Sequence, residues 1–479
     1  MRIEHDLLRG LERLLGRERV LSSREDLLLY EYDGSVEEAR PQCVVFPRST
    51  DEVLGIVRLA NQFKTPMVGR GAGTGLSGGA LAREGGVMIV FSQMNRVLEI
   101  DYENRRAVVQ PGVVNLELSR AVAHAGLHFA PDPSSQRACT IGGNVSENSG
   151  GPHTLAYGVT TNHVLGMKAV LPTGELICIG GSAVDSPGYD LCGLFVGSEG
   201  TFALVTEITV KLTPLPETVK TLLAIFDSID DTTETVADFT ARGITPAACE
   251  MLDGWTLRAV EAYVHAGFPL DCAAVLLLEV DGLRESVEAQ AKDMAEICAA
   301  HHAREVRVAR DAAERDLLWK GRKNAFGAVG RICPTYYVQD GVIPRTKLPA
   351  TLRRIDEIGK KYQLEIGNIF HAGDGNLHPL IMFDARDAEQ FKRVISAADE
   401  IIQYCIDAGG SITGEHGVGM EKDRLMPLLF SDAELGLMRS VRDTFNPTGL
   451  LNPGKIFPTG KGCGETRIRP LPVAGTAAR

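Results

Sequence analysis

The 479-residue chain has 44% hydrophobic and 23% charged residues, which is typical of a globular protein too long for one ordinary core. Its net charge of −12 disfavours nucleic acid as a partner, because phosphate binding needs concentrated Lys and Arg. No apolar run has transmembrane length, and ten scattered cysteines without a Cys-x-x-Cys pair argue against disulfides and iron–sulfur clusters. We therefore expect two or three domains, no direct membrane insertion and a cytoplasmic location.

The N-terminal part begins with charges inside an apolar periodicity, which predicts an amphipathic helix within a helical segment over residues 1–40. A first domain follows over residues 41–216. Residues 42–47 predict a strand, residues 49–63 an N-capped helix, and residues 66–69 a short strand that leads into a glycine-dense loop.

The first domain continues in short β-rich pieces up to Pro216, where Pro214-Leu-Pro216 suggests a boundary. Longer helices then alternate with strands over residues 217–445, which predicts an α+β domain with helices on one face of an antiparallel sheet. Among these, residues 312–329 predict one helix and residues 336–343 one strand. A turn-rich segment, residues 446–460, is expected to return to the first domain, and residues 461–479 to form a flexible tail.

The glycine-dense loop spans residues 70–79 and formally matches the dinucleotide fingerprint Gly-x-Gly-x-x-Gly at Gly73, Gly75 and Gly78. A Rossmann loop must open a helix, however, and only a few residues separate this loop from the next predicted strand. The alternatives are a set of tight turns or a nest of backbone N–H groups for a pyrophosphate. A second glycine-rich stretch, residues 131–151, favours a large phosphate-bearing cofactor.

Two further Gly-rich segments, residues 370–378 and 414–417, contain His371, His378, Glu415 and His416. Imidazole and carboxylate ligands together suit zinc, manganese or iron. Three protein ligands with an open position are typical of a catalytic site, so we predict that His371, His378 and Glu415 bind a divalent metal ion. His416, next to a ligand, would then be free to transfer a proton.

These motifs carry a family resemblance, found at residues 47–53, 70–79, 140–145, 197–201, 371–378, 414–417 and 452–455. Over roughly residues 20–460 the chain resembles FAD-linked oxidases of the vanillyl-alcohol oxidase (PCMH) type. It is most similar to the branch that includes FAD-binding subunits of bacterial glycolate oxidases, near the D-lactate and D-2-hydroxyglutarate dehydrogenases. The resemblance implies a two-part PCMH-type FAD-binding domain, an α+β cap domain and FAD between them.

The resemblance also implies which residues contact FAD. They are Arg70, Gly71, Gly73, Thr74, Gly75, Ser77 and Gly78 at the pyrophosphate; Pro131, Asp132, Ser135, Thr140, Gly143, Asn144, Ser149 and Gly150 at the flavin and phosphates; Glu199, Gly200 and Ile208 at the adenosine; and Asn452 at the isoalloxazine edge. Relatives with covalent flavin often have a histidine in the first loop. Residues 72–75 contain none, so we expect non-covalent FAD.

The activity that the resemblance implies is oxidation of a small 2-hydroxy acid, glycolate or D-lactate, to the 2-oxo acid, with hydride passing to flavin N5. The metal ion would bind the substrate carboxylate and hydroxyl, and His416 would take the proton. Arg322, three residues after Trp319, matches an arginine that holds the substrate carboxylate in related enzymes; its alternative is a solvated helix charge. Phe326 and the uncharged residues 336–338 disfavour a second substrate carboxylate.

Reoxidation of the flavin needs an electron acceptor. The resemblance implies a complex with a second flavin-type subunit and an iron–sulfur subunit, which would allow peripheral attachment at the inner membrane. Three alternatives remain open: a dehydrogenase for D-lactate or another D-2-hydroxy acid that acts alone, a metal-dependent hydrolase without flavin, and a non-catalytic electron-relay subunit. A hydrolase has no need of the two glycine-rich loops, and a relay subunit could dispense with the metal ligands.

Overall fold

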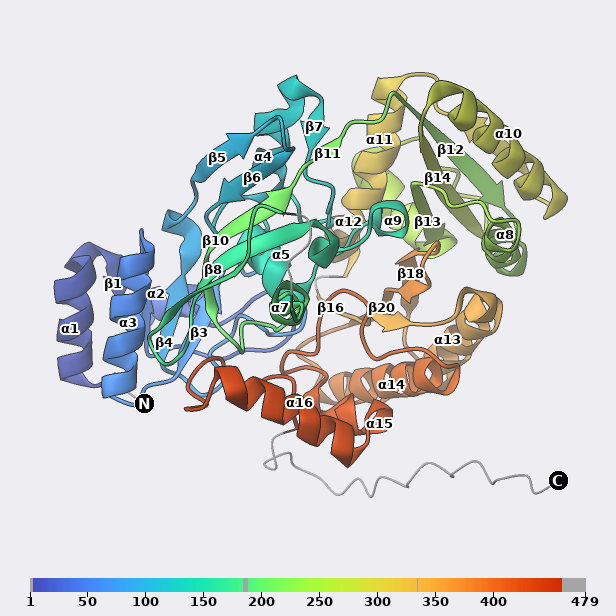
Figure 1. Ribbon diagram of the computed structural model, residues 1–479. Helices are drawn as coiled ribbons and strands as arrows, with labels where there is room; N and C mark the ends of the chain where they lie inside the picture. Colours follow the sequence, from blue (N-terminus) through green and yellow to red (C-terminus); the bar gives the residue numbers. More distant parts are fainter. Residues whose placement is uncertain (1–2, 184–187, 334, 459–479) are drawn as a thin grey trace, which may run out of the picture.

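The computed structural model describes residues 3–183, 188–333 and 335–458. The tail expected over residues 461–479 lies outside this part of the chain. Two sheets and a two-stranded ribbon form the first half of the molecule, and a larger third sheet forms the second half, as Figure 1 shows from blue to orange. The mixture of helices with largely antiparallel sheets confirms the predicted α+β class.

The first sheet is parallel except at one edge, and two helices cover one of its faces. Its strands, in spatial order, are β1 (Val20–Leu21), β2 (Cys43–Val45), β4 (Val87–Val90) and β3 (Met67–Arg70). The covering helices are α1 (His5–Leu15) and α3 (Thr50–Gln62), with the short α2 (Arg24–Leu27) nearby. The predicted N-cap is confirmed, because the Ser49 hydroxyl accepts a hydrogen bond from the Glu52 amide.

The second sheet is antiparallel and has the order β5-β6-β10-β8-β9. Its strands are β5 (Val97–Asp101), β6 (Arg106–Val109), β10 (Leu204–Lys211), β8 (Val164–Val170) and β9 (Leu176–Gly180). Around it lie α4 (Asn115–Val122), α5 (Ile141–Glu147), α6 (Thr154–Tyr157), α7 (Leu191–Phe195) and the ribbon of β7 (Leu127–His128) with β11 (Thr213–Pro214). Helix α5 packs against the core of the second sheet. It is part of the second glycine-rich stretch and brings that stretch toward the glycine loop of residues 70–79.

The third sheet has nine strands, with the path β15-β12-β14-β13-β18-β19-β17 and with β16 and β20 joined through β18. The strands are β12 (Thr218–Phe226), β13 (Ala248–Asp253), β14 (Ala274–Gly282), β15 (Glu305–Val308), β16 (Thr335–Val338), β17 (Gly341–Val342), β18 (Ile366–His371), β19 (Asn376–Leu377) and β20 (Pro379–Phe383). The predicted boundary near Pro214 falls between β11, a strand of the two-stranded ribbon, and β12 of the third sheet.

Helices cover both faces of the third sheet, so the expectation of helices on one face was wrong. One face packs against α8 (Ile229–Ala241), α10 (Arg284–Ala300), α13 (Leu348–Tyr362) and α14 (Ala388–Asp407). The other packs against α9 (Gly254–Val264), α11 (Ala312–Lys323) and α12 (Ala325–Ile332). The physical reason is visible in β14, whose apolar residues alternate between the two cores, with Leu276 in one and Leu277 in the other.

Two predicted elements are interrupted, and both interruptions matter for the site. The helix predicted over residues 312–329 is two helices that meet at Asn324, whose side chain donates to the Lys320 carbonyl. The strand predicted over residues 336–343 is split into β16 and β17, which leaves Asp340 between them.

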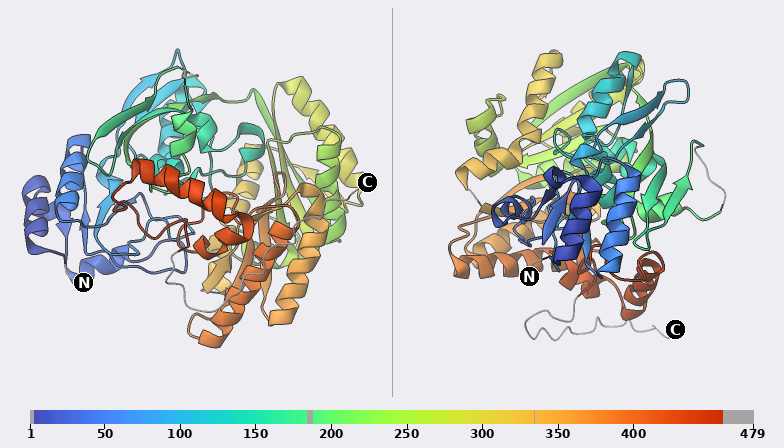
Figure 2. Two further views of the ribbon diagram at one scale, coloured as in Figure 1. Left: turned by 60° about the horizontal axis from the view of Figure 1, so that its bottom comes forward. Right: turned by 90° about the vertical axis from the view of Figure 1, so that its left-hand side faces the viewer.

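The C-terminal part contains α15 (Met426–Leu429) and α16 (Asp432–Phe445), and the chain then runs back to the first sheet. Figure 2 shows α16 in red alongside the first half of the molecule. The Met67 amide donates to the Leu450 carbonyl over 2.7 Å, and the Asn452 amide donates to the Met67 carbonyl over 2.7 Å. Across the described residues, no helix is both long and apolar enough to cross a membrane.

Candidate active site

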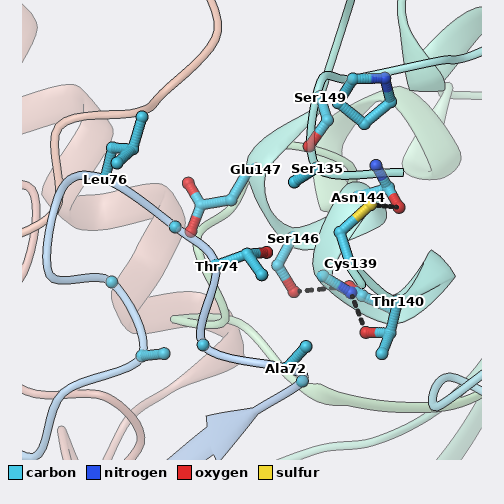
Figure 3. A pocket seen from close by; sticks show the side chains of 18 of the residues that line it. Ala72, Thr74, Leu76, Ser135, Cys139, Thr140, Asn144, Ser146, Glu147 and Ser149 are labelled. Atoms are coloured by element: carbon cyan, nitrogen blue, oxygen red, sulfur yellow. Dashed lines mark hydrogen bonds between the residues drawn. The ribbon is translucent and has the colours of Figure 1, made fainter. Parts of the chain in front are cut away.

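A cavity of about 360 Å³ lies between the two halves of the molecule. Both glycine-rich stretches line it from the first half, and part of the histidine cluster lines it from the second half. Figure 3 shows the first-half wall, where the loop of Ala72, Thr74 and Leu76 faces the helix that carries Asn144 and Ser146. Segments more than 300 residues apart in the sequence thus share one site.

The first glycine loop connects β3 to β4 without a helix, as the spacing of its glycines predicted. Gly73 has φ of 71°, a left-handed conformation that favours glycine. A Cβ on Gly75 would meet no atom within 4 Å, because that position faces the open cavity. Such a loop leaves space and backbone donors for a bound anion.

Two buried side chains next to this loop hold unused hydrogen-bond donors. Arg70 Nη1 and Asn144 Nδ2 have no hydrogen-bond partner among the described residues, although both residues line the cavity. Helix α5 begins beside them, where the Thr140 hydroxyl accepts from the Gly143 amide over 3.2 Å. Because buried donors without partners are rare, this wall fits a phosphate-bearing cofactor.

The structure divides the nineteen predicted cofactor residues into two groups. Those that line the cavity are Arg70, Gly71, Gly73, Thr74, Gly75, Ser135, Thr140, Gly143, Asn144, Ser149, Glu199 and Gly200; those that do not are Ser77, Gly78, Pro131, Asp132, Gly150, Ile208 and Asn452. Ile208 is fully buried in the core of the second sheet, because alternate residues of β10 point into that core.

Two residues of the second group instead hold neighbouring loops in place. The Ser77 hydroxyl donates to the His416 carbonyl over 2.9 Å, and Asn452 Nδ2 donates to the carbonyls of Gly79 and Glu199. Glu199 lines the cavity, but its carboxylate accepts from the amides of Val418 and Gly419 at 2.7 and 2.6 Å. These bonds attach the loop after His416 to the first half of the molecule.

The three predicted metal ligands come together beside β18 and β19 of the third sheet. His371 ends β18, His378 follows β19, and Glu415 lies on a loop nearby. His371 Nε2 is 3.3 Å from Glu415 Oε1, and His378 Nε2 is 3.4 Å from the same oxygen. All three ligand atoms lie within 4.8 Å of one another, a spacing that suits one cation.

The buried His378 ring supports a metal site at this position. Neither of its ring nitrogens makes a hydrogen bond with any described residue, although the side chain is almost completely buried. His378 Nε2 lies 3.4 Å from Glu415 Oε1 and 3.5 Å from Asp340 Oδ1 without a hydrogen bond to either, and a coordinated ion would satisfy this nitrogen. Burial alone would raise the pKa of Glu415, but His371, His378 and His416 outweigh burial and lower this pKa to about 2. The carboxylate is therefore ionised and available as a ligand.

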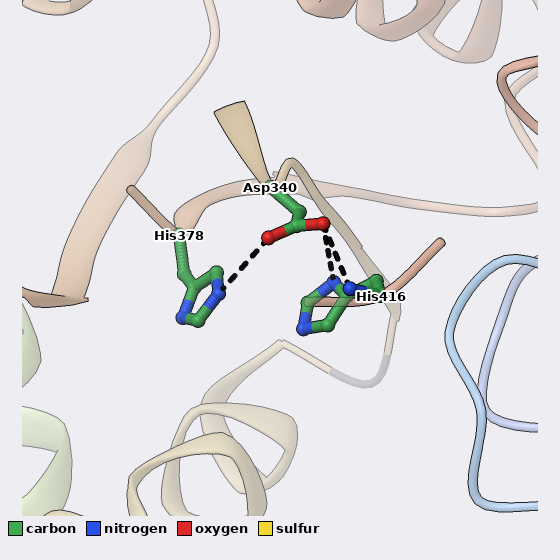
Figure 4. Close-up of side chains that lie close together, drawn as sticks. All are labelled: Asp340, His378 and His416. Carbon is green, nitrogen blue, oxygen red and sulfur yellow. Dashed lines mark hydrogen bonds and ion pairs between the residues drawn. The ribbon is translucent and has the colours of Figure 1, made fainter. Parts of the chain in front are cut away.

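A second group of possible ligands consists of Asp340, His378 and His416, shown in Figure 4. Asp340 already accepts from the amides of Gly414 and His416, and it also contacts Lys422 Nζ at 3.3 Å. A cation there would lie close to the Lys422 ammonium, which already neutralises Asp340. We therefore favour the group of His371, His378 and Glu415, in which Asp340 serves to hold the 414–416 loop.

His416 is placed to accept a proton at the cavity wall. Its ring stacks on that of His378, with centroids 4.8 Å apart and planes at 9°. Burial lowers the pKa of His416 to about 4, so the imidazole is neutral near pH 7 and can act as a base. His416 lines the cavity together with Glu415 and His378.

The arginine expected to meet a substrate does not line the cavity. Arg322 is 0% exposed, and its Nη2 lies 2.5 Å from Glu250 Oε2. Lys323, the next residue, does line the cavity and is held by Asp132 at 2.9 Å. Adjacent residues on a helix point about 100° apart, which explains why only one of the two reaches the wall.

Two residues of this site were not found from the sequence. Glu250 sits in the middle of β13, where a charged residue interrupts the apolar run that would have marked a strand. Asp340 sits at the break between β16 and β17. Both are fully buried carboxylates, and only their tertiary partners distinguish them from surface acids.

Comparison with known proteins identifies the family. The model of the FAD binding domain matches residues 41–180, and the model of FAD linked oxidases, C-terminal domain, matches residues 215–456. The chain belongs to the FAD-linked oxidases. It is 47% identical over 447 residues to the glycolate oxidase subunit GlcD of Escherichia coli, covering 93% of this chain and 90% of that one.

Other members of the FAD-linked oxidases are also similar over most of their length. A D-2-hydroxyglutarate dehydrogenase of Stutzerimonas stutzeri is 34% identical, with 94% of this chain and 98% of the relative covered. A D-lactate dehydrogenase of Anaerostipes hadrus is 33% identical, with 88% and 90% covered. The crystal structure of p-cresol methylhydroxylase with substrate bound has a TM-score of 0.81 at 17% identity, covering 94% of this chain and 96% of that one, and so shares the fold. This confirms the predicted fold, and the chain is an FAD-dependent oxidoreductase.

Proposed function

We propose that this FAD-linked oxidase oxidises a small 2-hydroxy acid, glycolate or D-lactate, to the 2-oxo acid. The observation that carries the proposal is that the glycine loops and the group of His378, Glu415 and His416 line one cavity. The similarity to glycolate oxidase subunits and to a D-lactate dehydrogenase supports the substrate class. A metal hydrolase would not need the glycine-rich wall of this cavity. An electron-relay subunit would not need the wall that carries His378, Glu415 and His416.

The chemistry removes a hydride from the α-carbon and a proton from the hydroxyl. When bound, FAD would supply the hydride acceptor, and a divalent ion held by His371, His378 and Glu415 would supply a Lewis acid that lowers the pKa of the substrate hydroxyl. Neutral His416 takes the hydroxyl proton at the cavity wall, and a C=O bond forms as the C–H bond breaks.

The substrate carboxylate needs a positive charge on the same wall. In this proposal Lys323 supplies it, while Arg322 lies behind the wall and acts through Glu250. Phe326 and Tyr336 also line this end, with ring centroids 6.4 Å apart, and leave it apolar. One cation among aromatic rings suits a small monocarboxylate better than a dicarboxylate.

Gly150 brings the two cofactor positions close together. A Cβ at Gly150 would lie 3.2 Å from Glu415 Oε2, so a bulkier residue would crowd the metal loop. The residues expected near the flavin thus directly adjoin a proposed metal ligand. This supports hydride and proton transfer from one bound substrate, because both acceptors must be within reach of its α-carbon and hydroxyl.

The proposal also includes assembly. We infer that the chain works as the FAD subunit of a glycolate oxidase complex, with a second flavin-type subunit and an iron–sulfur subunit as electron acceptors at the inner membrane. The similarity to subunits named GlcD supports this arrangement. The competing arrangement is a D-lactate dehydrogenase that acts alone.

Anaerobic flavin bleaching tests the activity. Glycolate or D-lactate is expected to bleach the visible absorbance of the bound flavin, because hydride transfer to the flavin reduces it. D-2-hydroxyglutarate should react far more slowly, because a second carboxylate would face Phe326 and Tyr336. Persistent flavin colour with every D- and L-2-hydroxy acid would reject the proposal, and a colourless protein that hydrolyses esters would favour the hydrolase.

Non-covalent binding of FAD predicts a simple result. Acid precipitation should release a yellow supernatant, because residues 72–75 contain no histidine at the place where relatives with covalent flavin often have one. The flavin in supernatant and pellet is measured by fluorescence. Flavin that stays with the washed pellet would show a covalent link.

A further inference from the structure

Glu250 lies directly opposite His371 on neighbouring antiparallel strands. The register of β13 and β18 pairs Glu250 with His371, so their side chains project on the same face of the sheet. Every residue of β13 is buried, and Glu250 is 0% exposed. The sheet itself therefore delivers a carboxylate to one particular imidazole.

The contact involves the ring nitrogen that faces away from the proposed metal position. His371 Nδ1 lies 2.7 Å from Glu250 Oε1 and 3.0 Å from Oε2, whereas His371 Nε2 faces Glu415 Oε1 at 3.3 Å. An ionised carboxylate has no proton to donate, so Nδ1 must carry the hydrogen in this pair. The lone pair of a neutral ring is then on Nε2, where the other two ligands converge.

A buried carboxylate remains ionised only when an opposite charge accompanies it. Arg322 Nη2 supplies that charge at 2.5 Å, and its side chain is as fully buried as that of Glu250. No other Lys or Arg of the described chain has an ion pair with Glu250. Arg322, Glu250, His371 and Glu415 therefore form a continuous series of contacts that ends at the cavity wall.

We propose that Glu250 is a positioning residue for the metal site: it holds His371 with Nε2 toward His378 and Glu415. This role for Glu250 rests on the metal ion in the proposed function. Carboxylates behind metal-bound histidines fix the tautomer and raise the basicity of the ligand, and their loss typically lowers metal affinity about 10- to 100-fold. Glu250 would act through His371 and would touch neither substrate nor cofactor.

The test is the zinc affinity of metal-stripped protein that retains FAD, measured by equilibrium dialysis, with manganese as a second probe. Glu250→Gln is expected to raise the zinc Kd about 10- to 100-fold, because a neutral amide cannot hold the imidazole ring as a carboxylate does. FAD content should not change. A wild-type Kd in Glu250→Gln would overturn the inference.

Asp253→Asn is the matched control. Asp253 is a buried carboxylate on the same strand, but it accepts from the amides of Thr256 and Asn368 and does not touch His371. The Asp253→Asn variant should be less stable but should bind zinc as the wild type does. If both variants lost zinc affinity equally, general destabilisation of the strand would explain the loss and a specific role for Glu250 would be refuted.

Glu250→Gln leaves Arg322 buried without a partner, which can prevent folding. Glu250→Gln/Arg322→Met removes that unpaired charge and should fold while showing the same loss of zinc affinity. Wild-type affinity in this double variant also overturns the inference. If the unaltered protein binds neither zinc nor manganese, the proposed metal site itself fails; if it binds them and the variants match it, only the role of Glu250 fails.

Discussion

His378→Ala is expected to abolish bound divalent metal and to lower turnover by about 10³-fold or more, while FAD remains bound. The expectation rests on His378 being buried without a hydrogen bond to any described residue, so that its clearest role is as a ligand. A Lewis acid supplies several kcal/mol of transition-state stabilisation, and about 4 kcal/mol corresponds to 10³-fold. Metal analysis and flavin absorbance are measured on the same sample.

A second buried histidine provides the control for this variant. His163 lies in the first half of the molecule, and its Nε2 hydrogen-bonds the Tyr157 carbonyl at 2.8 Å. His163→Ala should lose stability but keep metal and turnover per folded molecule. His371→Ala and Glu415→Ala should behave like His378→Ala, and full metal content with full activity in any of the three would remove that residue from the site.

His416→Ala is expected to keep both metal and FAD but to lower the rate of flavin reduction by about 10²-fold or more, the usual contribution of a general base. The structure supports a base because His416 lines the cavity and burial lowers its pKa to about 4, which leaves the ring neutral. Rapid mixing under anaerobic conditions measures the flavin reduction rate directly and excludes effects on reoxidation.

Two results would count against a base at this position. Flavin reduction at the wild-type rate in His416→Ala would show that another group takes the proton. Loss of metal from His416→Ala, with metal retained in His371→Ala, would move the ion to the second group, in which Asp340 and His378 are the other ligands.

Local patterns in the chain were enough for a large part of the site. The glycine loop of residues 70–79 and the histidine segment of residues 370–378 are contiguous, so their chemistry is visible without a fold. The helix predicted over residues 49–63 is α3, with Ser49 as its N-cap, because apolar periodicity and capping are local properties. The family resemblance added the expectation that FAD lies between the two halves of the molecule.

The tertiary structure decided which side chains meet. Glu250 and His371 are 121 residues apart, and only the pairing of β13 with β18 places them in contact. Arg322 and Lys323 are neighbours in sequence, yet helix geometry buries the first and brings the second to the cavity. The three ligands of the proposed metal site lie in two short segments and could be proposed from the sequence. Strand register and helix rotation depend on packing across the whole domain, so the residues that hold these ligands in place emerged only from the fold.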